Sequence, residues 1–498
     1  MSSWLKPTSR PAGPNRRWLI LGIVAIAQLM VVLDATIVNI ALPHAQRALH
    51  ISETNRQWVV TAYALAFGGL LLLGGRIADY GGRRRAFLIG LIGFAGASAL
   101  GAGAVSGDML FAARALQGAF GALLAPAALS VLTTTFEHGA DRAKAFAVYG
   151  SISAGGAAVG LLLGGILTQY LSWRWTLLVN TPIAIGAIFA AARFVPESRA
   201  EGTTRYDVPG AMSVTAGLVA IVYGFTRAST DGWGSSTTLG LLAAGVTLLA
   251  AFVAIELRST HPLLPMRIPL DRNRGGSYLA AIAVGGAMLG TFVFLSYYLQ
   301  LVKHYSPVKT GLAVVPISGI IIVAAVVATK LLPRLGPRLV MSAGGVIGAG
   351  GMLLLAQTTV SSSYVAHILP AELVLGFGMG LVFIPLQNTA THGVDPNDAG
   401  AASALTNASQ QIGGALGTAL FNTFYTVAVA SYLAANGHGA STLPHALVHG
   451  YDRAFSLAAA AILLAAIVAF SLIRGQRRER QRSDGRVALG TTPATDSV

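Results

Sequence analysis

Long apolar segments alternate with short polar ones along almost the whole chain. A transmembrane helix needs about 20 mostly apolar residues, and the sequence repeatedly supplies such lengths. The segments are Trp18–Ile40, Trp58–Gly75, Ala86–Val105, Met109–Phe136, Ala145–Leu171, Trp175–Ala192, Val208–Thr226, Thr237–Ile255, Gly275–Val302, Gly311–Thr329, Leu339–Gln357, Tyr364–Thr391, Ala399–Ala435 and Ala454–Ile473. The pattern predicts an all-α, polytopic membrane protein with fourteen transmembrane helices.

The distribution of basic residues sets the expected orientation. If the N-terminus is cytoplasmic, 26 of the 34 Lys and Arg residues fall in segments on the cytoplasmic side. Only 7 fall in external loops, and Arg114 lies within a span. Positive charge is retained on the cytoplasmic side of membrane proteins. We therefore expect both termini in the cytoplasm.

A weak internal repeat suggests how the spans are grouped. The Gly75–Arg85 loop after the second span resembles the Leu332–Arg338 loop after the tenth, since both combine glycine with several arginines. Two six-helix halves around a central site are a common transporter plan. We expect a cytoplasmic tail (1–17), an N-terminal half (18–194), a linker with two inserted helices (195–274), a C-terminal half (275–474) and a disordered cytoplasmic tail (475–498).

Composition narrows the classes of function. Charged residues make up 11% of the chain, against about 25% in soluble proteins, so most of the length belongs in a membrane. The absence of cysteine excludes disulfides, thiolate metal sites and cysteine nucleophiles. The net charge of +15 follows from the basic cytoplasmic loops, so no nucleic-acid partner is expected. No spans combine nucleophile, base and metal ligands, so we expect neither an enzyme nor a metal site.

Three ionisable residues other than histidine lie well within the predicted spans: Asp34, Arg114 and Glu372. Such residues are costly in a membrane and mark functional sites or buried pairs. At about 1.5 Å per residue, Asp34 and Arg114 reach nearly the same depth in the outer half of the bilayer. A proton-carrying pair and a static salt bridge both remain open. Glu372 could contact a cationic substrate, carry a second proton or lie at a cavity mouth.

The fifth span carries glycines four residues apart, at Gly156, Gly160 and Gly164, followed by Gly165. Glycines with this spacing share one helix face and allow another helix to approach closely. Ordinary tight packing is the alternative to a functional role.

Several motifs together resemble the major facilitator superfamily. The loop with Gly75, Asp79, Gly82, Arg83 and Arg84 is similar to the signature between its second and third helices. In that family these charged residues form a cytoplasmic gate. The resemblance therefore implies a gate at this loop.

Further motifs narrow the resemblance to the fourteen-span drug:proton antiporters of this superfamily. Arg114–Gly121 is similar to a motif linked to proton transfer, and Leu33–Pro43 to the first helix of these antiporters. The span-five glycines are similar to the antiporter motif, although Leu161 replaces its usual proline. The resemblance implies a monomer in the bacterial cytoplasmic membrane. It would export lipophilic drugs or antibiotics in exchange for protons, with no cofactor.

Substrate and direction are less constrained than the fold. An uptake symporter on the same fold and, with less support, a membrane-embedded enzyme are the rival functions. Span ten lacks the acid that members handling divalent cations carry, so we expect neutral, zwitterionic or monovalent substrates. Polarity and expected inward faces select the candidates for the substrate cavity, which are Gln28, Asn39, Tyr63, Glu372 and Gln387.

Overall fold

The computed structural model describes residues 14–136, 139–200, 207–259, 262–394, 398–439 and 441–474. These residues form helices joined by short loops, without a strand in the described part. The helices are α1 (Pro14–Ala48), α2 (Trp58–Gly81), α3 (Arg83–Ala102), α4 (Gly107–Thr135), α5 (Gly139–Tyr170), α6 (Trp175–Leu178), α7 (Asn180–Phe194), α8 (Val208–Asp231), α9 (Ser236–Arg258), α10 (Arg272–Tyr297), α11 (Pro307–Ala356), α12 (Leu369–Thr391), α13 (Ala399–Asn436) and α14 (Thr442–Leu472). Two π-helical turns, Tyr298–Val302 and Tyr364–Ile368, extend α10 and precede α12. The chain is an all-α, multi-pass membrane protein.

Within the described residues, thirteen helices are long and apolar enough to cross a membrane. The difference from the fourteen predicted spans lies in α11, which covers both the tenth and the eleventh. Gly336 interrupts α11 with φ 76° and ψ 165°, a conformation that glycine adopts without steric cost. One side of α12 contacts Ile317 and the other Gly344, so the two parts of α11 both lie beside α12. The count of fourteen stays a prediction that both parts span the membrane.

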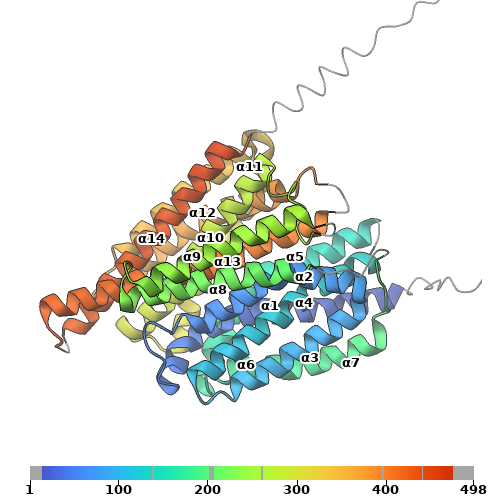
Figure 1. Cartoon of the computed structure of the whole chain (residues 1–498). Helices are drawn as coiled ribbons and strands as arrows, with labels where there is room; N and C mark the ends of the chain where they lie inside the picture. Colours follow the sequence, from blue (N-terminus) through green and yellow to red (C-terminus); the bar gives the residue numbers. More distant parts are fainter. Residues whose placement is uncertain are drawn as a thin grey trace, which may run out of the picture.

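The helices form two bundles, α1–α7 and α10–α14, shown from blue to green and from yellow to red in Figure 1. The inserted helices α8 and α9 run along these bundles, and α8 packs against both α2 and α13. Thr423 of α13 donates a hydrogen bond to the Phe225 carbonyl of α8, which ties the insert to the C-terminal bundle. The N-terminal tail before residue 14 and the tail expected at 475–498 lie outside the described residues.

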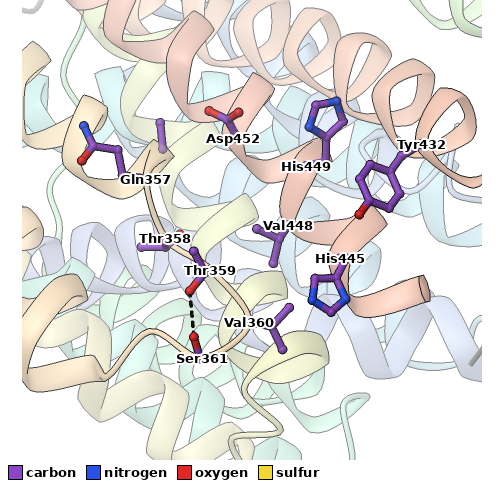
Figure 2. A pocket seen from close by; sticks show the side chains of 11 residues that line it. Gln357, Thr358, Thr359, Val360, Ser361, Tyr432, His445, Val448, His449 and Asp452 are labelled. Atoms are coloured by element: carbon purple, nitrogen blue, oxygen red, sulfur yellow. Dashed lines mark hydrogen bonds between the residues drawn. The ribbon is translucent and has the colours of Figure 1, made fainter. Parts of the chain in front are cut away.

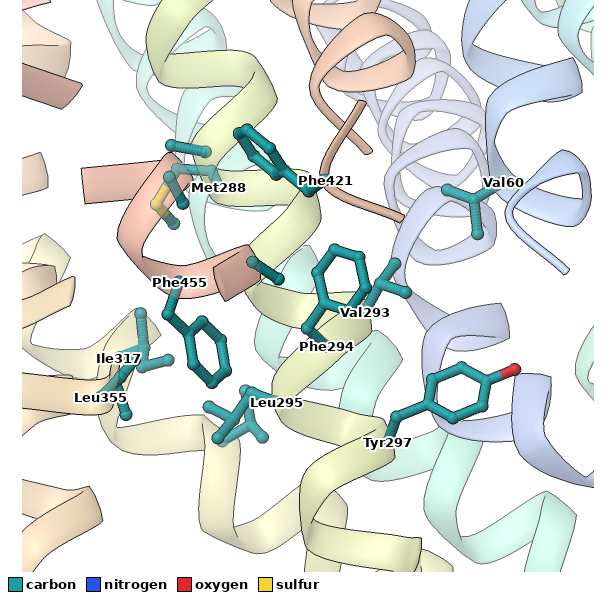
Figure 3. Close-up of a cluster of buried hydrophobic side chains, with 14 of the residues drawn as sticks. Val60, Met288, Val293, Phe294, Leu295, Tyr297, Ile317, Leu355, Phe421 and Phe455 are labelled. Atoms are coloured by element: carbon teal, nitrogen blue, oxygen red, sulfur yellow. The ribbon is translucent and has the colours of Figure 1, made fainter. Parts of the chain in front are cut away.

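Side chains of α10 occupy the centre of the largest apolar cluster (Figure 3). Phe294 and Leu295 of α10 pack there with Phe455 of α14, and Val60 of α2 joins from the N-terminal bundle. Since Val60 belongs to the other bundle, the cluster crosses the boundary between the two.

We call the end of the molecule where α2 turns into α3 at Gly82 the gate side, and the opposite end, between Ala48 and Trp58, the far side. The hydrogen bonds found between the bundles gather on the far side. Ser296 and Gln300 donate to the carbonyls of Asn39 and Ile40, each at 3.0 Å. The bundles are therefore closed against each other on the far side.

Candidate functional site

The carboxylate of Asp34 is the centre of a buried polar site in the N-terminal bundle. Its Oδ2 accepts a hydrogen bond from Arg114 Nη1 at 2.6 Å, and the side chains of both residues are fully buried. Its Oδ1 accepts from Gln117 Nε2 at 2.9 Å and from Asn180 Nδ2 at 2.7 Å. Three donors on two helices therefore surround one carboxylate. The direct contact expected between Asp34 and Arg114 is present.

Arg114 is held by neighbours other than Asp34. Its Nε donates to the Val59 carbonyl of α2 at 3.0 Å, and its guanidinium lies 4.5 Å from the Tyr63 ring centroid. Gln117, one turn further along α4, accepts from Arg114 and donates to both Asp34 and Ser98. The helices α1, α2, α3, α4 and α7 all contribute residues to this hydrogen-bond network. A change in the charge of Asp34 therefore alters contacts on five helices.

The span-five glycines bring α5 onto α1 directly beside Asp34. A Cβ added at Gly156 would lie 2.9 Å from Val32, and one added at Gly160 would meet the side chain of Thr36. A Cβ at Gly164 would lie 2.6 Å from the Ile37 carbonyl. The glycine face is therefore required for the close approach of α5 to the segment that carries Asp34.

Gly165 makes the same kind of contact with the other bundle. A Cβ there would lie 2.7 Å from the Pro307 carbonyl and 3.0 Å from Val308 Cα, at the start of α11. Gly311 of α11 packs in turn on the Leu161 carbonyl. We call this contact between α5 and α11 the far-side seal. Leu161, where the family usually has proline, contributes its backbone to the seal.

The predicted gate loop is held by ion pairs and hydrogen bonds on the gate side. Arg83 Nε lies 3.5 Å from Asp79 Oδ1, which also accepts from Ser130 of α4 at 3.0 Å. The Arg84 amide donates to Glu197 at 3.2 Å, and its guanidinium donates to the Ala192 carbonyl. The loop is thereby fastened to α4 and to the segment after α7.

Two glycines of the gate loop have different surroundings. Gly82 has φ 116° and faces Glu197, whose Oε1 would lie 2.8 Å from an added Cβ. At Gly75 an added Cβ would make an ordinary contact with Pro126 at 3.6 Å. Gly82 is therefore required by the backbone, whereas Gly75 is not sterically demanded.

We expect Gly82→Ala to destabilise the protein by about 1–3 kcal/mol, because an L side chain is strained at this φ and the added methyl meets Glu197. Thermal unfolding of the purified protein in detergent measures the effect. Gly96→Ala in α3, where an added Cβ has no neighbour within 4 Å, is the matched control. Equal unfolding temperatures for the two variants would contradict the structural role of Gly82.

A second buried cation, Arg56, lies on the far side between the bundles. It stacks between the rings of Tyr297 and Tyr425, 4.2 and 4.4 Å from their centroids. Its Nε donates to Asn422 at 3.1 Å and its Nη1 pairs with Glu53 at 2.7 Å. Arg56 therefore links the loop between α1 and α2 to α10 and α13.

Replacing Arg56 by methionine should lower the free energy of unfolding by about 2–4 kcal/mol, because two cation–π contacts and a buried charge-assisted hydrogen bond are lost. Chemical or thermal unfolding in detergent provides the measurement. Arg227→Met, which removes a half-exposed pair with Asp231 at 3.6 Å, should cost less than about 1 kcal/mol. Similar losses in the two variants would show that Arg56 does not hold the bundles together.

The five substrate-cavity candidates come from α1, α2 and α12 and differ in their surroundings. Tyr63 lies at the Asp34 site, whereas Asn39 lies where α1 meets α10, and its amide makes no side-chain hydrogen bond with a described residue. Gln28 accepts from Tyr149 of α5 at 2.8 Å. Glu372 is fully buried beside Tyr364, and Gln387 lies four turns further along α12. Asn39 is thus the strongest of the five, while Glu372 belongs to the interior of the C-terminal bundle.

A cavity of about 510 Å³ opens on the far side, away from these candidates (Figure 2). Thr358 and Ser361 form one wall, and Tyr432, His445 and His449 of α13 and α14 form the other. Among the described residues no group of three or more His, Asp or Glu side chains is placed to hold a metal ion.

Sequence reasoning did not select all residues of the site. Gln117 lies within the Arg114–Gly121 motif but was not singled out, and Asn180 was not among the predicted site residues, yet both donate to Asp34. Arg56 is one of the seven basic residues expected in external loops, and Glu197 was not among the predicted site residues. Spacing along a helix gives no signal for their contacts with Asp34, Asn422 and Arg84, because these partners lie on segments distant in sequence.

A multi-pass protein with two helical bundles, a buried acid–base pair and a charged turn between α2 and α3 has the architecture of a secondary transporter. The sequence model of the Major Facilitator Superfamily matches residues 24–418. The chain belongs to this family, whose members are transporters rather than enzymes.

Similar proteins extend over nearly the whole chain. The puromycin resistance protein pur8 of Streptomyces alboniger is 47% identical over 97% of this chain and 96% of its own length. The cephamycin export protein CmcT of Amycolatopsis lactamdurans is 39% identical, covering 90% and 91%. A bacterial homologue of the human lysosomal transporter Spinster, solved in an inward-facing and unoccupied conformation, aligns with a TM-score of 0.63 at 16% identity, covering 97% and 100%. This last likeness concerns the fold alone.

Proposed function

We propose that this protein exports antibiotics or other small lipophilic drugs in exchange for protons and thereby confers resistance. The observation that carries the proposal is Asp34, a buried carboxylate with three donors, beside the glycine face of α5. Two relatives that cover nearly the whole chain are a puromycin resistance protein and a cephamycin export protein. Their names support export as the direction of transport.

Asp34 is the proposed proton carrier, and its hydrogen bonds explain how a proton changes the site. A protonated Asp34 loses the charge that pairs with Arg114, and one of its oxygens becomes a donor. A proton on Oδ1, which already accepts from both Gln117 and Asn180, would displace one of these donors, and a proton on either oxygen weakens the pair with Arg114. The loss loosens the link between α1 and the helices α4 and α7, so that α1 can shift against α5.

The gate loop is the proposed cytoplasmic gate. Gly75, Asp79, Gly82, Arg83 and Arg84 form it, and the pairs of Asp79 with Arg83 and of Arg85 with Glu197 hold the loop on the gate side of the N-terminal bundle. This role places the gate side, and with it both termini, in the cytoplasm of a bacterium. The protein would act as a monomer and require no cofactor beyond the proton gradient.

The test is antibiotic accumulation in a pump-deficient bacterium with and without the protein. Puromycin, a cephamycin and a lipophilic dye form a suitable panel, and a strain expressing Asp34→Asn at equal membrane level is the control. We expect lower accumulation and higher resistance with the native protein, both removed by a protonophore. Higher accumulation would instead identify an uptake symporter, and export that persists with the protonophore would contradict proton coupling.

A further inference from the structure

Glu372 is a buried carboxyl group that shares the hydroxyl of Tyr364 with a backbone carbonyl. Tyr364 Oη lies 2.8 Å from the Ala313 carbonyl and 3.2 Å from Glu372 Oε2. A tyrosine hydroxyl has one proton to donate, and a backbone carbonyl can only accept. The tyrosine proton can serve only one of these two acceptors at a time, and the Ala313 oxygen is the nearer. With the proton on Ala313, the contact with Glu372 is a hydrogen bond only when the carboxyl is protonated and donates to Tyr364 Oη.

The charged neighbours of Glu372 lead to the same state. Its side chain is fully buried, and no ion pair with it is found among the described residues. Lys309, at the start of α11, is exposed and places its Nζ 3.8 Å from the Tyr305 ring. His367, on the π-helical turn that carries Tyr364, is also exposed. A buried carboxylate without a cation is costly and normally becomes neutral by binding a proton. Asp34, by contrast, has Arg114.

The position of Glu372 corresponds to that of Arg114 in the other bundle. Gly118, four residues after Arg114, packs on the Tyr63 carbonyl of α2, and Gly376, four residues after Glu372, packs on the Ile317 carbonyl of α11. Arg114 donates to the Val59 carbonyl, as Tyr364 does to that of Ala313. The same number of residues separates the members of three pairs: Tyr63 and Ile317, Val59 and Ala313, and the positive-φ glycines Gly82 and Gly336. The C-terminal bundle thus places a carboxyl where the N-terminal bundle places the partner of its proton carrier.

Glu372 also lies directly behind the far-side seal. Ala313, which accepts from Tyr364, is two residues from Gly311, whose close contact is the Leu161 carbonyl of α5. Separation of α11 from α5 would move Ala313 and its bond to Tyr364. Water from the far side would then reach the Glu372 carboxyl.

We propose that Glu372 is a second proton-binding residue of the transporter, loaded from the far side. With the seal open, its carboxylate takes a proton from far-side water. With the seal closed, it holds the proton as the acid that donates to Tyr364. It releases the proton to water on the gate side before the next cycle, so two protons, one on Asp34 and one here, enter per cycle. This inference rests on the proposed proton-coupled export.

Infrared difference spectroscopy of the purified protein at neutral pH tests the protonation state without any substrate. We expect the carbonyl band of a buried carboxylic acid in the native protein, its loss in Glu372→Gln, and a shifted band in Glu372→Asp. Asp231→Asn, which removes a surface carboxylate paired with Arg227, should keep the band. If Glu372→Gln keeps the acid band and loses carboxylate absorption instead, Glu372 is ionised and the proposal is overturned. Glu372→Asp decides the question if the glutamine variant does not fold.

The second arm measures protons exchanged per puromycin in proteoliposomes with a pH-sensitive dye. We expect the ratio to fall by one in Glu372→Gln relative to the native protein. An unchanged ratio would overturn the proposal even if the infrared band is present. Puromycin transport without any proton movement in the native protein would overturn the proposed function, while the infrared arm would still report on Glu372.

Discussion

Asp34→Asn should reduce export to the level of cells that lack the protein. Asparagine cannot bind and release a proton near neutral pH, and it removes the charge that Arg114 pairs with at 2.6 Å. The site then has one fixed state in place of the two that proton coupling needs. Antibiotic accumulation under an imposed pH gradient, measured at equal membrane level of the two proteins, provides the test.

Folding and function must be separated in this variant, because Arg114 is left buried without its partner. Breaking a buried ion pair costs about 3–5 kcal/mol, so size-exclusion profiles and unfolding temperatures should accompany transport. Asp34→Glu keeps the charge and should retain partial export, and Asp231→Asn should retain full export. A folded Asp34→Asn protein that exports at the native rate under the gradient would show that the pair is a static salt bridge.

Asp34 shows most clearly which contacts of the site the sequence predicts and which it does not. The sequence placed Asp34 and Arg114 at one depth, because rise per residue in a helix is fixed. It did not supply Gln117 and Asn180 as ligands of the same carboxylate, because which helix faces meet depends on packing between distant segments. The glycine spacing in α5 predicted a close helix contact, whereas its partners, α1 beside Asp34 and the start of α11, came only from the structure.

Glu372 is a second residue whose role the sequence alone does not decide. Hydropathy located it within a span and left three roles open. The contacts of Tyr364 and the correspondence with Arg114, which come only from the structure, support the proposed role of Glu372 as a proton-binding residue. The difference between thirteen helices and fourteen predicted spans arises at Gly336, where the turn is too short to separate the two parts of α11 as a loop would.

Gly165→Val should abolish export by preventing closure of the far-side seal. The added side chain meets backbone atoms of Pro307 and Val308, which can be avoided only by moving α11 away from α5. Overpacking of this kind costs about 1–3 kcal/mol of free energy. The cost destabilises only the sealed state, in which the two helices are in contact. Such a cost shifts the balance between sealed and open states about 5–150-fold. The transporter should then remain open on the far side.

Because the native chain has no cysteine, a single introduced one reports on the seal without background. Thr310, fully buried in α11 beside the seal, is the reporter position. In cells, Thr310→Cys should resist a membrane-impermeant maleimide, and addition of Gly165→Val should make it reactive. Gly186→Val in α7, where an added Cβ has no neighbour within 4 Å, is the matched control and should leave Thr310→Cys protected. Protection in the Gly165→Val protein would contradict the seal, and labelling only from the cytoplasmic side of inverted vesicles would reverse the proposed orientation.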